Sequence, residues 1–172
     1  MRRFTVFFVL AIGCVVNAQE FSTKSIDLGI VVSDLEKSVE FYKNAIGMKE
    51  VPGFSVPADW CKDVGLTDRH ALDIRVMVLG EGAGASKIKL MQLPNVKSEK
   101  PTNKHIHSSF GFSYITIGVN DADAAHARLK KAGAKTVAKS PMPLPTPFPS
   151  HIILTVVRDP DGNLIELVGP KK

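Results

Sequence analysis

Cysteine is scarce in this chain of 172 residues, which has only Cys14 and Cys61. Cys14 lies in an apolar N-terminal segment, and removal of that segment excludes an intrachain disulfide and a zinc site built on cysteines. A strong basic cluster is also absent, because the lysines and arginines are scattered and the formal net charge is +5. Two of the arginines belong to the N-terminal segment as well. This weak charge pattern excludes the main basis for nucleic-acid binding.

Disordered and fibrous compositions are likewise excluded. Hydrophobic residues make up 44% of the chain and charged residues 23%, a balance typical of a folded globular protein. The thirteen glycines follow no collagen-like period. The length therefore predicts one ordinary domain.

Residues 1–18 are interpreted as a secretory signal peptide. Two arginines open the chain, residues 4–16 are apolar, and the small residue Ala18 ends the segment. This apolar run is too short to cross a bilayer as a helix. We expect cleavage between Ala18 and Gln19, with export to the periplasm or the extracellular space. A lipoprotein anchored through Cys14 and an uncleaved anchor are the two alternatives.

The remaining residues, 19–172, are interpreted as a single domain of two similar halves. Each half runs from a strand into an acidic helix start, a helix that ends near a glycine, a short strand and a hairpin. The first repeat covers about 24–93, a polar linker about 94–110, and the second repeat about 111–170. One such unit cannot cover its own sheet, so two are expected together. The predicted fold class is α+β, with two β-α-β-β-β repeats forming a curved eight-strand mixed sheet and with helices outside.

The individual elements follow from periodicity and from turn residues. Ser33 is predicted to cap the first helix, with Glu36 reaching back to it, and Gly47 ends that helix. In the first half, strands are expected over 25–32, 48–51, 73–79 and 87–93, with a helical turn around 57–62. In the second half, a helix capped by 120–123 runs to Lys131, and strands are expected over 112–119, 135–138, 151–157 and 163–168.

Two segments interrupt this pattern. The insertion over 52–71 carries Phe54, Trp60 and Cys61, and it either forms a lid over the concave face or covers a sheet edge. The segment 141–149 has proline at every second position, which predicts a stiff, extended, polyproline-II-like loop between the sixth and seventh strands.

Three stretches carry a family resemblance. They are IDLGIVVSDLEKSVEFYKNAIGMKEV, YITIGVNDADAAHARLKKAGAK and VVRDPDGNLIELVGP, which together extend over nearly all of the domain. The chain resembles the vicinal oxygen chelate superfamily, which includes glyoxalase I, extradiol dioxygenases, methylmalonyl-CoA epimerase and fosfomycin- or bleomycin-resistance proteins. The resemblance implies a concave sheet with a small-molecule site on its inner face.

In metal-using members of that superfamily, four inward-facing residues hold a divalent ion. The resemblance assigns these positions to Asp27, Lys89, Tyr114 and Glu166, and only Glu166 keeps the usual residue type. An ammonium has no lone pair to give, so Lys89 argues against a metal. We hypothesise that a polar cluster centred on Lys89 replaces the ion, so that no cofactor is expected. The alternative is that the Lys89 side chain simply extends to solvent and forms no such cluster.

A divalent metal stays open as the other alternative. A one-residue shift in the register of the strand would turn Lys89 outward. A metal site with fewer protein ligands, Asp27 and Glu166, would then be possible. Outside the family positions, His105 and His107 lie on one side of an extended segment and are the best substitute pair of ligands. Linker histidines are more often simply solvated.

The inner face is predicted to bind a small molecule. Its expected ligand-binding residues are mostly apolar, and they are Val31, Met91, Phe112, Thr116 and Leu164. The same mixture of residue types is also typical of an ordinary hydrophobic core. The predicted partners are a small-molecule ligand and a second copy of the chain, with no nucleic acid and no transmembrane segment in the mature chain.

Three functions stay open. The first is a glyoxalase-like lyase or isomerase, with Glu166 as general base and with Lys89 or Tyr114 stabilising a developing enolate beside a carbonyl. The second is a non-catalytic protein that sequesters a small molecule, as the resemblance to bleomycin-resistance proteins implies. The third is an interaction domain without a ligand.

Overall fold

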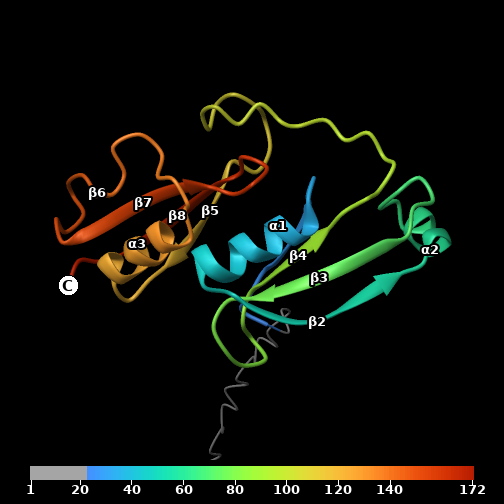
Figure 1. Cartoon of the computed structure of the whole chain (residues 1–172), viewed down its shortest axis with the longest axis horizontal. Helices are drawn as coiled ribbons and strands as arrows, with labels where there is room; N and C mark the ends of the chain where they lie inside the picture. The colour runs from blue at the N-terminus through green and yellow to red at the C-terminus, as the bar shows by residue number, and fades with distance from the viewer. Residues whose placement is uncertain (1–22) are drawn as a thin grey trace, which may run out of the picture.

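The computed structural model of this protein describes residues 23–172. It contains two four-stranded sheets, one from each half of the chain (Figure 1). The first sheet has the order β1-β4-β3-β2, with strands β1 (Asp27–Val31), β2 (Lys49–Val56), β3 (Leu72–Val78) and β4 (Lys87–Met91). The second has the order β5-β8-β7-β6, with strands β5 (Tyr114–Gly118), β6 (Met142–Pro143), β7 (Ile152–Arg158) and β8 (Leu164–Pro170).

The two halves have equivalent strand pairings. In each sheet the first strand pairs in parallel with the last one, and the other pairs are antiparallel. The α+β class and the two β-α-β-β-β repeats are therefore confirmed. The eight strands are divided between two sheets, however, because β1 is hydrogen-bonded only to β4, and β5 only to β8, among the residues described.

Three α-helices and one π-helical turn occupy the described residues, and all but one of them pack on the sheet faces that form the main core. They are α1 (Leu35–Glu40), which continues directly into the π-helical turn η1 (Phe41–Ile46), α2 (Ala58–Asp63) and α3 (Ala122–Lys131). α1 packs against β4, α3 packs against β7 and β8, and α3 also packs against η1. The exception is α2, which lies at the far end of β2 and β3 (Figure 1).

The start of α1 differs from the prediction. Its N-cap is Asp34, whose carboxylate accepts a hydrogen bond from the Lys37 amide at 3.0 Å. Ser33 instead donates, through its amide and its hydroxyl, to the Asp161 carboxylate at 3.0 and 2.5 Å. Glu36 contacts Arg75 rather than reaching back. The reason is tertiary, since the turn around Asp161 occupies Ser33.

Two strands of the prediction also need correction. The segment 135–138 contributes only an isolated bridge between Thr136 and Val157, and the chain then turns at Ala138, whose φ is +51°. The sixth strand lies instead inside the proline-rich segment, as β6. β2 extends to Val56, well into the predicted insertion, with an irregularity between Val51 and Phe54.

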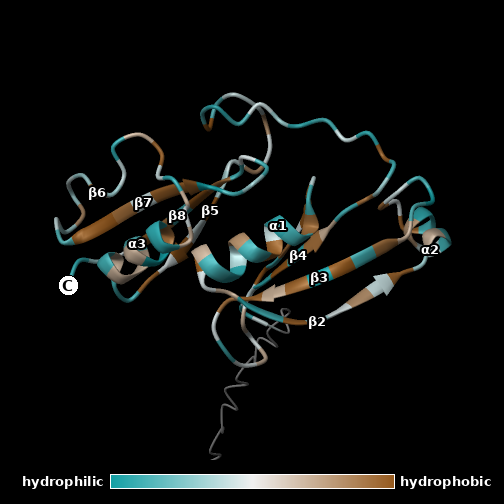
Figure 2. Cartoon of the chain, in the orientation of Figure 1, coloured by the Kyte–Doolittle hydropathy of each residue, from teal (hydrophilic) through white to brown (hydrophobic). Residues whose placement is uncertain are grey.

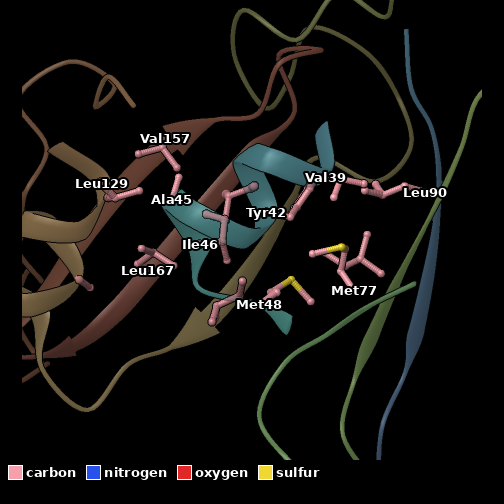
Figure 3. Packing of buried hydrophobic residues seen from close by; sticks show 14 of the residues in the cluster. Val39, Tyr42, Ala45, Ile46, Met48, Met77, Leu90, Leu129, Val157 and Leu167 are labelled. Carbon is pink, nitrogen blue, oxygen red and sulfur yellow. The ribbon is translucent and has the colours of Figure 1, made fainter. Parts of the chain in front are cut away.

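The main hydrophobic core joins the two halves through α1 and η1. Figure 3 shows side chains from both sheets around these turns: Leu90 and Met77 belong to the first sheet, and Val157 and Leu167 to the second. Tyr42 lies among them and is fully buried. Figure 2 shows the corresponding alternation, since hydrophobic residues colour the strands and one side of the helices. Burial of this shared core explains why the two repeats pack as one unit.

Polar contacts reinforce the junction between the halves. The Tyr42 hydroxyl donates a hydrogen bond to Asp159 Oδ2 at 3.0 Å. Arg128 of α3 donates from Nε and Nη2 to the carbonyl oxygens of Ala45 and Ile46, at 3.1 and 3.0 Å. These carbonyls end η1 and lack partners within it, so Arg128 closes the first helix from the second half of the chain.

Candidate functional site

The concave side of each sheet carries the residues that alternate with the core. In β1, Leu28 and Ile30 pack against the main core, while Asp27, Gly29 and Val31 are exposed on the opposite face. The same alternation in β4 buries Ile88 and Leu90, so that Lys89 lies on the face of Asp27. The structure therefore has the register in which Lys89 faces away from the helices.

Lys89 and Asp27 form an ion pair on the first sheet. The Lys89 Nζ lies 2.9 Å from Asp27 Oδ2, and both side chains are about one-third exposed, at 33% and 32%. The hydrogen bond from Lys89 lowers the pKa of Asp27 more than partial burial raises it. The carboxylate is thus held in its charged form beside the ammonium.

Glu166 and Thr116 form a second polar pair, on the other sheet. Thr116 Oγ1 donates to Glu166 Oε2 at 2.7 Å, as expected for residues directly opposite one another in β5 and β8. Within residues 23–172, no ion pair joins Glu166 to Lys89 and no hydrogen bond engages the Tyr114 hydroxyl. Of the four residues predicted as one cluster, only Asp27 and Lys89 contact one another, while Glu166 pairs with Thr116 and Tyr114 stands apart.

An open cavity of about 230 Å³ lies where β1 and β5 face one another. Of the five predicted ligand-binding residues, Val31, Phe112 and Leu164 line it, together with Tyr114. Met91 and Thr116 lie on the two concave faces but outside this lining. The structure adds residues that periodicity had not singled out: Leu28, Gly29, Ile30, Tyr42, Ser113, Ile115, Asn163 and Ile165.

No charged side chain belongs to the lining. Its polar members are Tyr42, Ser113, Tyr114 and Asn163, and the rest are apolar apart from Gly29. Burial and the neighbouring Asp159 carboxylate raise the pKa of Tyr42, so that its hydroxyl remains a neutral donor. A mostly apolar cavity with a few fixed polar groups is typical of small-molecule sites.

The linker forms an outer wall of this site. Asn163, which lines the cavity, donates to Asp159 at 2.9 Å and accepts a hydrogen bond from Asn103 of the linker at 3.3 Å. Arg158 Nη2 donates to the Lys104 carbonyl at 2.9 Å. A smaller cavity of about 90 Å³ within the linker shares Phe112 and Asn163 with the main one.

The insertion around α2 lies elsewhere. Cys61 is fully buried against Leu72, Ile74 and Val76, on the face of β3 opposite the main core. Trp60 is half exposed, and neither residue lines the cavity between β1 and β5. The insertion therefore packs on the concave face of the first sheet at its far end, and it does not reach the cavity between β1 and β5.

The divalent ion that the resemblance implies does not fit the family positions. The Lys89 ammonium lies 2.9 Å from the Asp27 carboxylate, where it supplies positive charge but no lone pair. Glu166 is hydrogen-bonded on the other sheet. In the described part of the chain, no group of three or more His, Cys, Asp or Glu residues is arranged to hold a metal ion.

His105 and His107 stay apart from these positions. Their imidazole rings lie on the linker with centroids 5.4 Å apart and planes 10° from parallel. His105 also lines the smaller linker cavity.

Across residues 23–172, none of the helices has the length and apolar composition needed to cross a membrane.

Solved structures share this arrangement of modules. A glyoxalase family protein from Bacillus cereus is 22% identical and superimposes with a TM-score of 0.69, with 91% of this chain and 99% of that chain covered. A glyoxylase/bleomycin resistance protein/dioxygenase domain from Frankia sp. is 18% identical with a TM-score of 0.59, over 90% and 94% of the two chains. Glyoxalase I from Zea mays is 18% identical with a TM-score of 0.62, and the match covers 86% of this chain but 45% of that one.

These identities are low, so the likeness establishes the fold alone. No curated protein matches the chain at a significant level. The family model described as Glyoxalase/Bleomycin resistance protein/Dioxygenase superfamily, however, matches residues 25–167, which is most of the chain. The chain therefore belongs to the glyoxalase/bleomycin resistance protein/dioxygenase superfamily.

Proposed function

We propose that this protein binds a small, largely apolar molecule in the cavity between β1 and β5. The observation that supports this most strongly is the lining, which has aliphatic and aromatic side chains from both halves and no charged group. The two polar pairs, Asp27–Lys89 and Thr116–Glu166, lie on the adjoining concave faces. A ligand with an apolar body and a polar end matches this distribution.

A substitution that fills the cavity tests the proposal. A Cβ at Gly29 would lie 3.3 Å from Met91 Cε, so Gly29→Val adds bulk at the lining and displaces only a flexible methionine end. Gly118→Val is the matched control, because its Cβ meets nothing within 4 Å and it lies outside the lining.

The readout is a thermal-shift screen of small aromatic and aliphatic carbonyl compounds, followed by calorimetric titration of each hit. A ligand at 100 times its Kd stabilises the folded state by about 2.7 kcal/mol, which such a screen detects. We expect Gly29→Val to weaken binding by about tenfold or more and Gly118→Val to leave it unchanged. Equal affinities in both variants would place the ligand elsewhere.

A second candidate is an enzyme that moves a proton beside a carbonyl. It is supported by the Glu166 carboxylate, which is hydrogen-bonded by Thr116 but not neutralised by any cation in the described residues. In this reaction Glu166 takes the proton from carbon, the electron pair moves onto the carbonyl oxygen, and Lys89 or Tyr114 stabilises the enolate. Return of the proton to the opposite face of the same carbon, as the electron pair returns from oxygen and the carbonyl re-forms, gives the epimerised product.

Glu166→Gln separates the two candidates. It keeps the hydrogen bond from Thr116 but removes the base. Turnover of a carbonyl ligand that falls at least about a hundredfold while binding is retained supports the enzyme. Binding without turnover in the unaltered protein supports sequestration.

We also propose that the chain is exported. The support is the sequence of residues 1–18, which lie outside the described residues. An exported protein meets small molecules from outside the cytoplasm, which suits both candidates.

A further inference from the structure

We propose that His105 and His107 form a binding site for one divalent transition-metal ion, Cu²⁺ or Zn²⁺, on the linker between the two repeats. This site is independent of the family positions around Asp27 and Glu166, and it is independent of the proposed ligand cavity. It uses two imidazoles and leaves the remaining coordination positions to water.

The backbone that carries the two histidines is held in place. His105 and Ser108 exchange two hydrogen bonds across a tight turn, from the His105 amide to Ser108 Oγ at 2.9 Å and from the Ser108 amide to the His105 carbonyl at 3.0 Å. Ser113 Oγ donates to the Ile106 carbonyl at 3.2 Å. Arg158 holds the preceding carbonyl, at Lys104. The turn is thus a prearranged scaffold, which reduces the entropy lost when an ion binds.

The separation of the rings matches what one ion requires. The two ring centroids are 5.4 Å apart. Metal–nitrogen bonds of about 2.0–2.1 Å, together with the size of an imidazole ring, place two ring centres about 5 Å apart at a tetrahedral angle. The side chains therefore need little translation to share an ion.

The rings must still turn for both nitrogens to face one point. The torsion that turns an imidazole about its Cβ–Cγ bond is broad and soft, so this rotation costs little. Both histidines are exposed, and no hydrogen bond or ion pair engages either ring in the described residues. Rotation of the imidazoles therefore has to separate the two stacked rings, but it breaks no hydrogen bond or ion pair among the described residues.

The chemistry favours ions of the borderline class. Neutral imidazole suits Zn²⁺ and Cu²⁺, and Cu²⁺ binds most tightly among the divalent first-row ions. Two imidazoles without a carboxylate do not suit Mg²⁺ or Ca²⁺, which prefer oxygen ligands. His105 also lines the linker cavity that shares Phe112 with the main one, so an ion here would stiffen the outer wall of that site.

The test uses the full chain without a histidine tag, titrated with Cu²⁺ and separately with Zn²⁺ by calorimetry. We expect one ion per chain, and we expect each of His105→Ala and His107→Ala to weaken binding by about tenfold or more. His151→Ala is the matched control, because His151 is also exposed but lies alone at the start of β7. Its affinity should equal that of the unaltered chain.

Electron paramagnetic resonance of the Cu²⁺-loaded chain supplies an independent readout. Coupling to two imidazole nitrogens is expected, and it should be lost in either alanine variant while circular dichroism stays unchanged. The proposal is overturned by equal affinities in the unaltered chain and the His105→Ala/His107→Ala double variant. A spectrum with a single nitrogen would also overturn it.

Discussion

At the scale of single residues, Lys89 places a positive charge on the inner face of the first sheet. The family resemblance assigns Lys89 to a metal-ligand position, and its ammonium pairs with Asp27 at 2.9 Å. The pair removes the need for an ion to neutralise that carboxylate. Glu166, in contrast, accepts a hydrogen bond from the Thr116 hydroxyl, and within residues 23–172 no cation forms an ion pair with it.

Asp27→Asn tests the ion pair. The pKa of Asp27 is lowered in the folded state, so the pair stabilises the fold above the unfolded pKa, about 3.9, and this contribution is lost as pH falls through the folded value. Both partners are about one-third exposed, so we expect a loss below about 1 kcal/mol at pH 7 and a smaller loss at pH 2. Urea unfolding at both pH values measures this loss. An undiminished loss at pH 2 would refute the assignment.

Tyr42→Phe tests the buried hydroxyl. It removes the donor to Asp159 within the core, and we expect a cost of about 1–3 kcal/mol in the free energy of unfolding. Because the pKa of Tyr42 is raised above its unfolded value, this contribution is full below about pH 10 and declines at higher pH. Tyr114→Phe is the control, since its half-exposed hydroxyl has no partner among the described residues, and it should change stability by less than about 0.5 kcal/mol.

At the scale of elements, residues of the second half contact the chain just before α1 and at the end of η1. Asp161 takes Ser33 away from its predicted capping role, and Arg128 closes the carbonyl end of η1. Both partners lie more than eighty positions away from the residues they contact. The helices of the two repeats are therefore tied to one another as well as to their own sheets.

Arg128→Met tests this tie. The guanidinium makes two hydrogen bonds to the end of η1, while methionine preserves much of the apolar stem. We expect a loss of about 1–3 kcal/mol in the free energy of unfolding, because the carbonyls lose charged donors. Lys131→Met, three residues further along α3 and without an ion pair in the described region, should cost less than about 0.5 kcal/mol. Chemical denaturation of both variants gives the comparison, and equal losses would contradict the prediction.

At the scale of the whole molecule, two sheets and a linker surround one cavity. Neither repeat contains that cavity alone, because its lining comes from β1, η1, β5, β8 and the approach to β5. The linker crosses from β4 to β5 and is held at Asn103 and Lys104 (Figure 1). Assembly of the two repeats therefore creates the site.

The proposed export of the protein depends on its N-terminal segment, residues 1–18. If residues 1–18 are a signal peptide, the protein recovered from outside the cytoplasm begins at Gln19. Terminal sequencing by mass spectrometry measures this directly. A lipid-modified N-terminus at Cys14 would establish the lipoprotein alternative, and a retained Met1 would establish the uncleaved anchor.

Much of the fold could be predicted from local patterns. The strand alternation that buries Ile88 and Leu90 also sends Lys89 to the opposite face, and this is readable from period two alone. The sixth strand could not be predicted in this way, because β6 is held by its antiparallel pairing with β7 rather than by its own residues, Met142 and Pro143. Nor could the cavity lining, since Tyr42 and Asn163 reach it from a helix and a turn.

Patterns within the sequence were enough to predict the repeat, the superfamily and the residue types at the four positions that the resemblance assigns. These depend on local periodicity, turn residues and motifs, which each segment carries within itself. Which polar groups contact one another depends on how the strands pair. Asp27 meets Lys89 because their strands are hydrogen-bonded neighbours, while Glu166 meets Thr116 in a different sheet. Side chains on the same predicted face interact only when their strands are adjacent, and that adjacency is set by the parallel pairing of the first strand with the last one inside each sheet.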